Sequence, residues 1–487
     1  MKRTSLTTAV IAGIAGVAGI SNMASAVYLN NDGLGQVLIY PYYTVNGGNS
    51  TAITVVNTTG TAKAVKVRFL EAYDSREVLD FNLYLSHFDY WTAQVVPVGG
   101  GAGVFSNDNS CTVPALPKTS GSAYPFSTAA FDGSVTANDG GPKTVSRTLE
   151  GYVELIEMGT LLNTTQSSAA AATHSGGVPA NCGQLVKAWA GGYWASAAAT
   201  DIGPTTGGLF GSGTIVNVNL GTIEGYNADA IDQFYNDILP HHTTPTSLSP
   251  SISSNTSRTS YVFASTPTST VAQLATTTYA VPAPSVDAIS SLFMADNIYN
   301  EYWTSGGTGA NSEWVITFPT KRFYVDPTLV PVARAPFDVR FTAANGGTSC
   351  SPIFINWYDR EEGTASGSIG FSPQPVFGNA LCYEAQVVTF NQTGASSVVL
   401  GSKLTANIST GFNNGWAQID LFGASPAQHV LATASSANVF NGLPVTGFWV
   451  TQLVNGNIGG VLSNYTALYR HKLHRLCSTA AGTAACS

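Results

Sequence analysis

QVLIYPYYTVNGGNSTAITVVN, residues 36–57, is the stretch that decides the fold class. Its two arms, 36–45 and 51–57, are rich in Val, Ile, Thr and Tyr, which favour β-strands. Asn46-Gly-Gly-Asn49 stands between them, and Asn and Gly in such a position are a strong signal for a tight hairpin turn. We therefore expect two strands joined as a hairpin.

Alternation of apolar and polar residues continues downstream. In 64–70, Val65, Val67 and Phe69 fall on one face of a strand, and the residues between them are basic. This pattern is typical of a strand with one buried and one wet face. Two further runs follow, at 77–85 and 88–96. Short strands separated by turns predict an antiparallel β-sandwich of immunoglobulin-like type.

The remainder of the chain has the same character, with one exception. The exception is 285–302, where Val286, Ile289 and Phe293 recur at helical spacing behind the N-cap candidate Ser285. Stretches 97–146 and 167–177 have loop composition. Further strands are expected at 151–158, 208–220, 313–317, 322–325, 353–358, 384–390, 397–404, 415–421 and 445–454.

These patterns predict a mainly β chain with two antiparallel β-sandwich domains, immunoglobulin-like or jelly-roll-like, and one short helical insertion. The stretch 240–285, rich in Ser, Thr and Pro, is either an ordered surface crossing or a flexible linker. The predicted division is a signal peptide (1–26), an N-terminal sandwich with long loops (27–225), a Ser/Thr/Pro-rich connection with the helix (226–310), and a C-terminal sandwich with a polar tail (311–487).

The first residues have the composition of an export signal. Lys2 and Arg3 precede an apolar run at 9–20, and Ala24-Ser-Ala26 matches a signal-peptidase site. We therefore expect an exported protein, extracellular or on the cell surface, with a periplasmic location left open. No later run of about 18 apolar residues is present, so no transmembrane segment is expected in the mature chain.

The cysteines support an oxidising location. An even number of them in an exported chain predicts disulfides, and pairing sequence neighbours is one of about 15 arrangements. That pairing would join 111 with 182, 350 with 382, and 477 with 486. The candidates are Cys111, Cys182, Cys350, Cys382, Cys477 and Cys486.

Composition limits the partners. The net charge is −8 and only 10% of residues are charged, against roughly 25% in average proteins. No basic cluster suited to phosphate binding is present, so nucleic acid is not expected as a partner. Low charge with abundant Thr, Asn and Gly fits self-assembly or contact with a surface polysaccharide. Many secreted β proteins share this composition whatever their role.

No motif predicts catalysis. Gly-x-Ser-x-Gly, His-Glu-x-x-His and the phosphate-binding Gly-x-x-x-x-Gly-Lys-Ser/Thr are all absent from the sequence. Glu154 and Glu157 form a local carboxylate pair, but residues three apart on a strand face opposite sides. His471 and His474 near Cys477 could hold a metal on a helix, yet a basic, solvated terminal segment is the favoured interpretation.

We expect no cofactor, with structural calcium as the alternative. Oxygen ligands of the kind that calcium uses occur in Asn30-Asn-Asp-Gly33 and Asn107-Asp-Asn109, without the spacing of an EF-hand loop. Aromatic clusters offer another kind of site, because exposed rings could stack on sugars. Most aromatics on strands instead fill the core. The candidate ligand-binding rings are Trp91, Trp194 and Trp303.

Several blocks resemble a group of uncharacterised exported, surface-associated proteins of Gram-negative bacteria. They are GLGQVLIYPYYTV (33–45), VVNTT (55–59), SREVLDFNLYL (75–85), WVITFPTKRFY (314–324) and DREE (359–362). The resemblance implies export and a surface setting, and it carries no catalytic residues. Within the fourth block, Lys321 and Arg322 would pair with the acidic residues of the fifth.

Two functions from different classes follow. The first is a non-enzymatic, exported structural or adhesive cell-surface protein, such as a component of a surface layer. The alternative is a secreted carbohydrate-binding or carbohydrate-cleaving protein that uses clustered aromatics and dispersed carboxylates.

Overall fold

The computed structural model describes residues 26–134, 138–267, 269–279, 283–304, 306–366, 370–371, 380–391, 396–423, 428–433 and 438–479. The predicted signal peptide therefore lies outside the described residues, apart from Ala26. The prediction of a mainly β fold built from antiparallel sheets is confirmed. Parallel pairing is confined, among the described strands, to Val27–Leu29 with Thr259–Thr266 and to Ala385–Asn391 with Thr405–Ser409.

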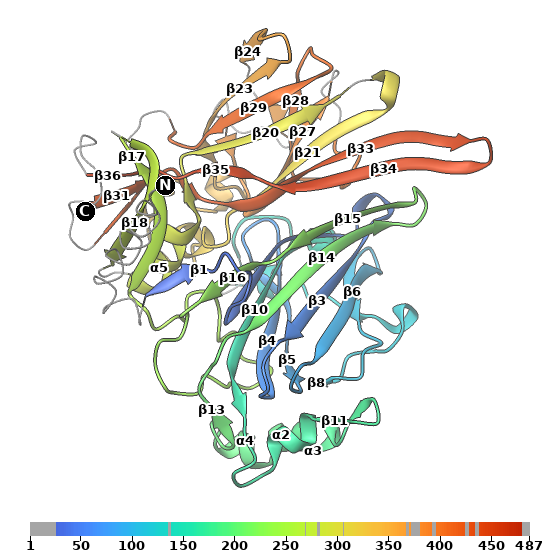
Figure 1. Ribbon diagram of the computed structural model, residues 1–487, viewed down its shortest axis with the longest axis vertical. Helices are drawn as coiled ribbons and strands as arrows, with labels where there is room; N and C mark the ends of the chain where they lie inside the picture. Colours follow the sequence, from blue (N-terminus) through green and yellow to red (C-terminus); the bar gives the residue numbers. More distant parts are fainter. Residues whose placement is uncertain are drawn as a thin grey trace, which may run out of the picture.

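The first half of the chain supplies two large sheets (Figure 1). Their strands are β1 Val27–Leu29, β2 Val37–Thr44, β3 Ser50–Asn57, β4 Lys63–Glu71, β5 Glu77–Leu85, β6 Tyr90–Val98, β7 Gly101–Phe105, β8 Cys111–Val113, β9 Tyr124–Pro125, β10 Glu150–Leu161, β13 Ile202–Gly203, β14 Leu209–Asn217, β15 Thr222–Asn227, β16 Asp229–Asp232, β17 Thr259–Thr266 and β18 Ser269–Thr278. One sheet has the order β18-β17-β1-β16-β2-β10-β4-β5-β8, with β13 paired to β10, and the other β15-β14-β3-β6-β7-β9.

The second half of the chain supplies two further large sheets. Their strands are β20 Asn297–Trp303, β21 Ala310–Thr317, β23 Phe354–Asp359, β24 Thr364–Ser366, β25 Gly370–Phe371, β27 Ala385–Asn391, β28 Thr405–Ser409, β29 Asn414–Asp420, β33 Thr446–Ile458, β34 Val461–Arg470 and β35 Lys472–His474. The orders are β24-β23-β29-β20-β35 and β25-β28-β27-β21-β33-β34.

Small sheets and helices complete the described residues. The small sheets pair β11 His174–Ser175 with β12 Val178–Pro179, β19 Met294–Ala295 with β32 Leu443–Pro444, β22 Ser351–Pro352 with β26 Ala380–Leu381, and β31 Asn438–Asn441 with both β30 Val430–Ala432 and β36 Cys477–Thr479. The α-helices are α2 Ser168–Ala172, α3 Cys182–Trp189, α4 Tyr193–Ser196, α5 Pro284–Phe293 and α6 Arg322–Val325. None of these helices is long and apolar enough to cross a membrane.

The predicted hairpin at 36–57 is wrong, although both strands form. β2 and β3 belong to different sheets, and the turn between them is a short 3-10 helix in which Gly47 and Gly48 have positive φ. Every residue of β2 is buried, so this strand lies in the interior of the larger sheet, whereas β3 alternates. The Asn-Gly-Gly-Asn turn therefore carries the chain from one sheet to the other.

One hydrophobic core runs through both halves of the chain. It joins Tyr42, Val55 and Trp91 of the first half to Val315 and Trp449 of the second. Thr317 Oγ1 also donates to the Pro41 carbonyl at 2.6 Å. The two sandwiches predicted from the sequence thus share buried surface, and the boundaries at 225 and 310 stay predictions.

The predicted connection contributes to the larger sheet. β16, β17 and β18 all lie within residues 226–310. Between them the chain packs over that sheet, where Lys66 Nζ donates to the Thr244 carbonyl and Asn82 Nδ2 to the Thr243 carbonyl. Of the two alternatives for this stretch, the structure has the ordered surface crossing.

The predicted helix at 285–302 forms only in its first half. α5 ends at Phe293, and 297–303 is strand β20, in which buried and exposed residues alternate. Pro284 occupies the first turn and Ala283, not Ser285, is the N-cap residue. The loop expected at 167–177 includes helix α2, and α3 was also not expected.

Two predicted strands are absent. Residues 322–325 form α6. Residues 397–404 have no strand, because the amides of Val398, Val399 and Leu400 donate to the buried carboxylate of Glu313, at 2.7 to 3.0 Å. A carboxylate that accepts several backbone amides replaces a neighbouring strand as their partner.

Candidate functional site

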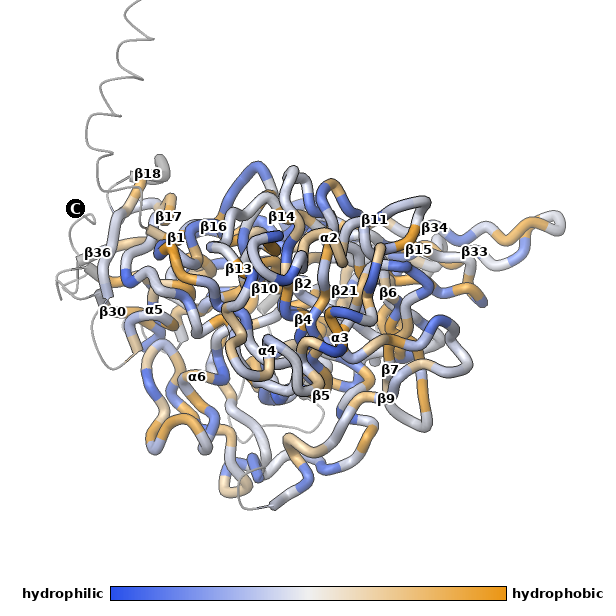
Figure 2. The backbone as a smooth tube through the Cα atoms, turned by 90° about the horizontal axis from the view of Figure 1, so that it is seen from below, coloured by the Kyte–Doolittle hydropathy of each residue, from blue (hydrophilic) through white to orange (hydrophobic). Residues whose placement is uncertain are grey.

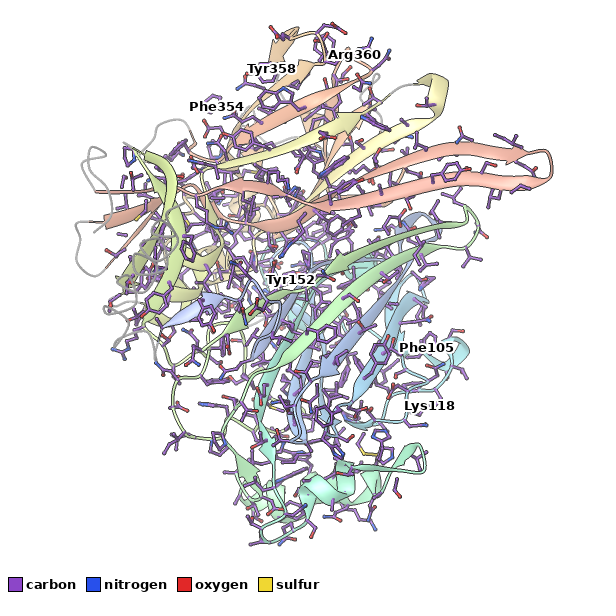
Figure 3. The ribbon with its side chains drawn as sticks, in the orientation of Figure 1. Phe105, Lys118, Tyr152, Phe354, Tyr358 and Arg360 are labelled. Atoms are coloured by element: carbon purple, nitrogen blue, oxygen red, sulfur yellow. A yellow bond between two sulfur atoms is a disulfide. The ribbon has the colours of Figure 1, made fainter. Side chains whose placement is uncertain are left out.

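The outer face of the sheet β24-β23-β29-β20-β35 presents aromatic rings (Figure 3). In β20, β23 and β29 buried residues alternate with intermediate or exposed ones. The buried set, which includes Ile298, Ile355 and Ile419, packs into the core. Because side chains on a strand alternate, the intervening residues must point outward. They are Tyr299, Glu301, Trp303, Phe354, Asn356, Tyr358, Asn414, Trp416, Gln418 and Asp420.

The strand register brings the rings into rows. Trp416 lies opposite Glu301 on one side and opposite Tyr358 on the other. The Tyr358 and Trp416 rings stack with centroids 4.3 Å apart and an interplanar angle of 14°. The Tyr299 ring lies 6.4 Å from Trp416. Trp416 remains 41% exposed, so the stacked pair offers an open ring surface to solvent.

The next rows add hydrogen-bonding groups. Gln418 lies between Tyr299 and Asn356, and its Nε2 donates to Asn297 Oδ1. Asn414 lies opposite Trp303, whose side chain is 43% exposed. Flat aromatic surface interspersed with amide and carboxylate groups can stack on a ligand and hydrogen-bond to it at once.

A cavity of about 560 Å³ opens at one end of this face. Asp359 Oδ1 accepts hydrogen bonds from the amides of Glu361 and Gly363, which shapes the loop at its rim. Arg360 pairs with Glu361 at 3.0 Å, and both side chains are exposed. The cavity is lined by Trp303, Thr308, Asp359, Arg360, Glu361, Gly411, Phe412, Asn413, Asn414 and Leu453.

Among the predicted ligand-binding rings, only Trp303 lies on this surface. Trp91 is fully buried in the main core, and Trp194 is buried beneath Trp189 and Tyr84. Neither ring can stack on a sugar, which corrects that part of the prediction. Trp91 belongs to the buried set of the alternating strand β6, and Trp194 is the buried residue of helix α4. Tyr358 and Trp416 were not among the predicted rings, although the alternation in FINWYD (354–359) and NGWAQID (414–420) indicates that they point away from the core.

Two of the three predicted disulfides form. Cys111 bonds Cys182, which joins strand β8 to helix α3. Cys350 bonds Cys382 beside β22 and β26. The third pairing includes Cys486, which lies outside the described residues. Cys477 itself is buried at the start of β36.

The local carboxylate pair has a structural role. Glu154 pairs with Arg68, and Glu157 accepts from Lys63 Nζ at 2.7 Å, with all four side chains buried. Burial raises the pKa of both carboxyls, while their basic partners lower it. Buried charges of this kind are tolerated because they are paired.

The basic C-terminal segment is not solvated as expected. His471 is buried, its Nε2 lies 2.6 Å from the Val315 carbonyl, and burial lowers its pKa to about 4. His474 bonds Asp296 from strand β35. The described residues contain no group of three or more His, Cys, Asp or Glu side chains placed to hold a metal ion.

The two calcium candidates form turns. Asn30 Oδ1 accepts from the Asp32 amide, and Asp108 Oδ1 accepts from the Ser110 amide and hydroxyl. Such bonds are the usual local use of Asn and Asp in turns. The pairing proposed for Lys321 and Arg322 is wrong, because Lys321 Nζ donates to the Ser349 carbonyl and Arg322 pairs with Asp326.

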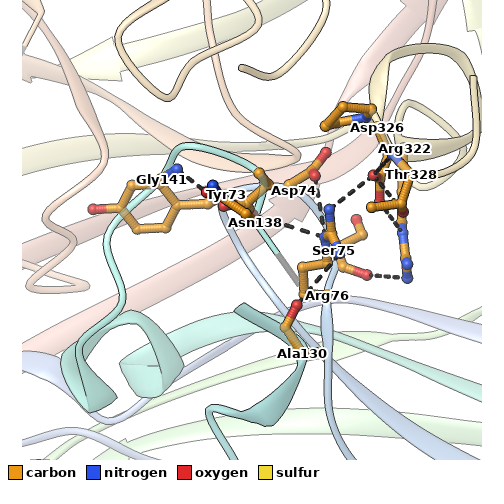
Figure 4. Close-up of polar contacts among 12 residues, drawn as sticks. Tyr73, Asp74, Ser75, Arg76, Ala130, Asn138, Gly141, Arg322, Asp326 and Thr328 are labelled. Carbon is orange, nitrogen blue, oxygen red and sulfur yellow. Dashed lines mark hydrogen bonds and ion pairs between the residues drawn. The ribbon is translucent and has the colours of Figure 1, made fainter. Parts of the chain in front are cut away.

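A second polar cluster lies in the interior, where the two halves meet (Figure 4). Arg76 donates to Asp74, to Asp326 and to the Ala130 carbonyl. Ser75, at a φ of 52°, donates from Oγ to Glu384 Oε2 at 2.9 Å. The charged side chains of the cluster are buried, and Arg76 of the first half bonds Asp326 of the second, so the cluster holds the halves together.

Comparisons of the chain with protein-family models, with curated proteins and with solved structures found no match. The candidate site therefore rests on its geometry alone.

Proposed function

We propose that this protein is a non-enzymatic, exported adhesive protein that binds polysaccharide through the aromatic face of β20, β29 and β23. The stacked Tyr358–Trp416 pair, open to solvent, carries the proposal. Sugar rings present apolar C–H faces that stack on aromatic rings, while their hydroxyls need amide and carboxylate partners. Asn356, Gln418 and Glu301 lie in the same rows as the rings.

Export is supported by the two disulfides, since such bonds persist in oxidising compartments. An extended, flat face fits a polymer better than a small molecule, because successive sugar units can meet successive rings. The rows Trp303–Asn414 and Glu301–Trp416–Tyr358 run side by side across the strands.

Affinity electrophoresis of the full chain, in gels containing xylan, mixed-linkage β-glucan or dextran, tests this proposal. We expect retardation by at least one polymer, and its loss in Trp416→Ala and in Trp303→Ala. Tyr90→Ala is the matched control, since Tyr90 is 54% exposed on β6, in another sheet.

The proposal is overturned if Trp416→Ala, Trp303→Ala and Tyr90→Ala are all retarded equally. It is also overturned if none of the polymers retards the wild type. Release of reducing ends from any of the polymers would replace it with the carbohydrate-cleaving alternative.

A second function, self-assembly, is favoured by a separate observation. The β33–β34 hairpin projects from the body as an arm (Figure 1), and apolar residues alternate with hydrophilic ones along its outer part (Figure 2). Its tip, residues 454–463, carries no charge, and Ile458 and Val461 are 60% and 65% exposed. Asn464 Nδ2 donates to the Leu220 carbonyl, so the neighbouring β14–β15 turn braces the arm.

The same chain offers an apolar groove for such an arm. The groove has a volume of about 660 Å³ and shares no residue with the arm. An arm of one copy seated in the groove of the next is a head-to-tail contact, which builds chains instead of closed dimers. The groove is lined by Val78, Leu79, Phe81, Pro114, Ala115, Leu116, Tyr124, Ala129, Ala130, Pro245, Leu248 and a few polar residues.

A further inference from the structure

A groove runs between strands β1, β17 and β35, away from the aromatic rows. It consists of two adjoining cavities, of about 540 and 360 Å³. Both are lined by Leu29, Asn31, Leu473 and Arg475, so these residues lie where the cavities meet. The Ser265 amide donates to the Arg475 carbonyl at 2.8 Å, which fixes the backbone there.

Arg475 is a cation whose guanidinium has no partner among the described residues. Its guanidinium makes no hydrogen bond or ion pair with the residues that the structure describes, although it is only partly exposed. The neighbouring Arg470 is paired with Asp229, and His474 with Asp296. Burial, and then the charge of Arg470, lower the pKa of Arg475.

A partly buried guanidinium that lacks a carboxylate is a site for an anion, because its five donors match a planar oxyanion in two-pronged geometry. Lys472 adds a second positive charge to the larger cavity. Asp32 lies on the wall of that cavity and is exposed. The anionic group is therefore placed at Arg475, where the cavities meet.

The smaller cavity has an apolar side and a polar side. Leu29, Val262, Leu292 and Leu473 line the apolar side, where Phe263 is 61% exposed. Asn31, Ser265 and His474 line the polar side, next to Arg475. A volume of about 360 Å³ suits a small organic molecule. An inorganic anion would leave the apolar side without a partner.

We propose that this groove binds an organic monocarboxylate, whose carboxylate pairs with Arg475 and whose apolar chain lies in the smaller cavity. The proposal does not depend on polysaccharide binding. It uses residues of β1, β17 and α5 that the aromatic face does not contain.

Isothermal titration of the full, disulfide-bonded chain with octanoate tests the proposal. We expect saturable one-to-one binding that weakens at least tenfold in Arg475→Gln. Arg258→Gln is the matched control, because Arg258 is exposed and lines neither cavity. Octan-1-ol, with the same chain and no charge, should bind at least tenfold more weakly than octanoate.

Two further measurements separate the outcomes. Phe263→Ala should weaken octanoate binding without affecting acetate, and it keeps the test valid if Arg475→Gln does not fold. Trp416→Ala should leave octanoate binding unchanged, whatever it does to polysaccharide. No binding of octanoate, equal binding by Arg475→Gln, or tighter binding of inorganic phosphate than of octanoate would each overturn the proposal.

Discussion

Tyr358 and Trp416 face each other across neighbouring antiparallel strands, and their rings stack at 4.3 Å on the outer face of the sheet. Because the core does not cover these rings, their burial contributes little to the free energy of folding. Each ring holds the other flat, so together they present a preformed surface to a ligand.

This relationship predicts coupling in polysaccharide binding. Tyr358→Ala and Trp416→Ala should each weaken binding roughly tenfold, corresponding to about 1.4 kcal/mol. The double variant should lose less binding free energy than the sum of the two single losses. Either single change already removes the stacking that holds the remaining ring in place. Affinity electrophoresis over a range of polymer concentrations measures all three. Strict additivity would mean that the rings bind independently.

His242 should make the protein less stable in mild acid. Its Nδ1 donates to the Ala198 carbonyl, and its Nε2 accepts from Tyr84 OH, which itself accepts from Trp189. Burial lowers the pKa of His242 to about 4. Between these pH values His242 is protonated in the unfolded chain and neutral in the folded chain. The free energy of unfolding therefore falls as the pH drops from about 6.5 to 4.

The contribution of this side chain is up to about 3 kcal/mol at pH 4. Thermal unfolding of His242→Gln between pH 4 and 7 should show a shallower decline than the wild type. The exposed His87 provides the control, as His87→Gln should keep the wild-type slope. Parallel curves for wild type and His242→Gln would contradict the prediction.

Glu384 should act in the opposite direction at higher pH. Burial raises its pKa to about 8, and its Oε2 accepts from Ser75. The folded chain keeps a proton that the unfolded chain releases above about pH 4.5. Stability contributed by this group is therefore present in acid and is lost as the pH rises toward 8.

Glu384→Gln removes this titration. Its stability relative to the wild type should rise with pH between 5 and 7.5, by up to about 3 kcal/mol. Lys321, whose pKa burial lowers to about 8, affects stability only above that window. Urea unfolding at several pH values measures the trend, with the exposed Glu362→Gln as control. A constant difference across the range would show that Glu384 is ionised in the fold.

The Cys111–Cys182 disulfide should stabilise the helical segment around α3. It closes a loop with a sequence separation of 71 residues, for which chain entropy predicts about 4 kcal/mol. Replacing both cysteines by Ala should expose Lys187, within α3, to rapid trypsin cleavage. Removing Cys350–Cys382 in the same way is the matched control and should not speed cleavage at this residue. Slow cleavage at Lys187 in both variants would show that packing alone holds the helix.

Association through the arm can be tested at its tip. Sedimentation velocity of the full chain should show concentration-dependent growth that Ile458→Asn/Val461→Asn abolishes. Ile238→Asn alters a side chain that is 84% exposed elsewhere, and it should associate like the wild type. A wild type that stays monomeric at high concentration would rule out this role for the arm.

Local chemistry made much of the secondary structure predictable. Period-two alternation correctly marked the positions of β4, β5 and β6, and neighbour pairing of cysteines correctly gave 111–182 and 350–382. The expected wet face of β4 is wrong, because every residue of this strand is buried and its basic side chains pair with carboxylates. Predictions failed where a distant group supplied the hydrogen-bond partner. Residues 397–404 are not a strand because Glu313, some 85 residues earlier, accepts their amides.

The candidate site was only partly predictable for a related reason. Trp91 and Trp303 look alike in sequence, since each follows directly after a tyrosine. One faces the core and the other the solvent, which depends on the sheet that packs against each strand. Arg475 shows the same limit, because only the tertiary structure places it in a groove where no described residue pairs with its guanidinium.

The sequence by itself determined the β class and the positions of most of the strands predicted from it, because alternation and turn residues act through neighbours along the chain. The two correct cysteine pairings belonged to one arrangement among about 15. Only the tertiary structure decided that β2 and β3 enter different sheets, which aromatic rings are exposed, and that both halves share one core. Those outcomes depend on contacts between residues hundreds of positions apart, whose free energies no local pattern records.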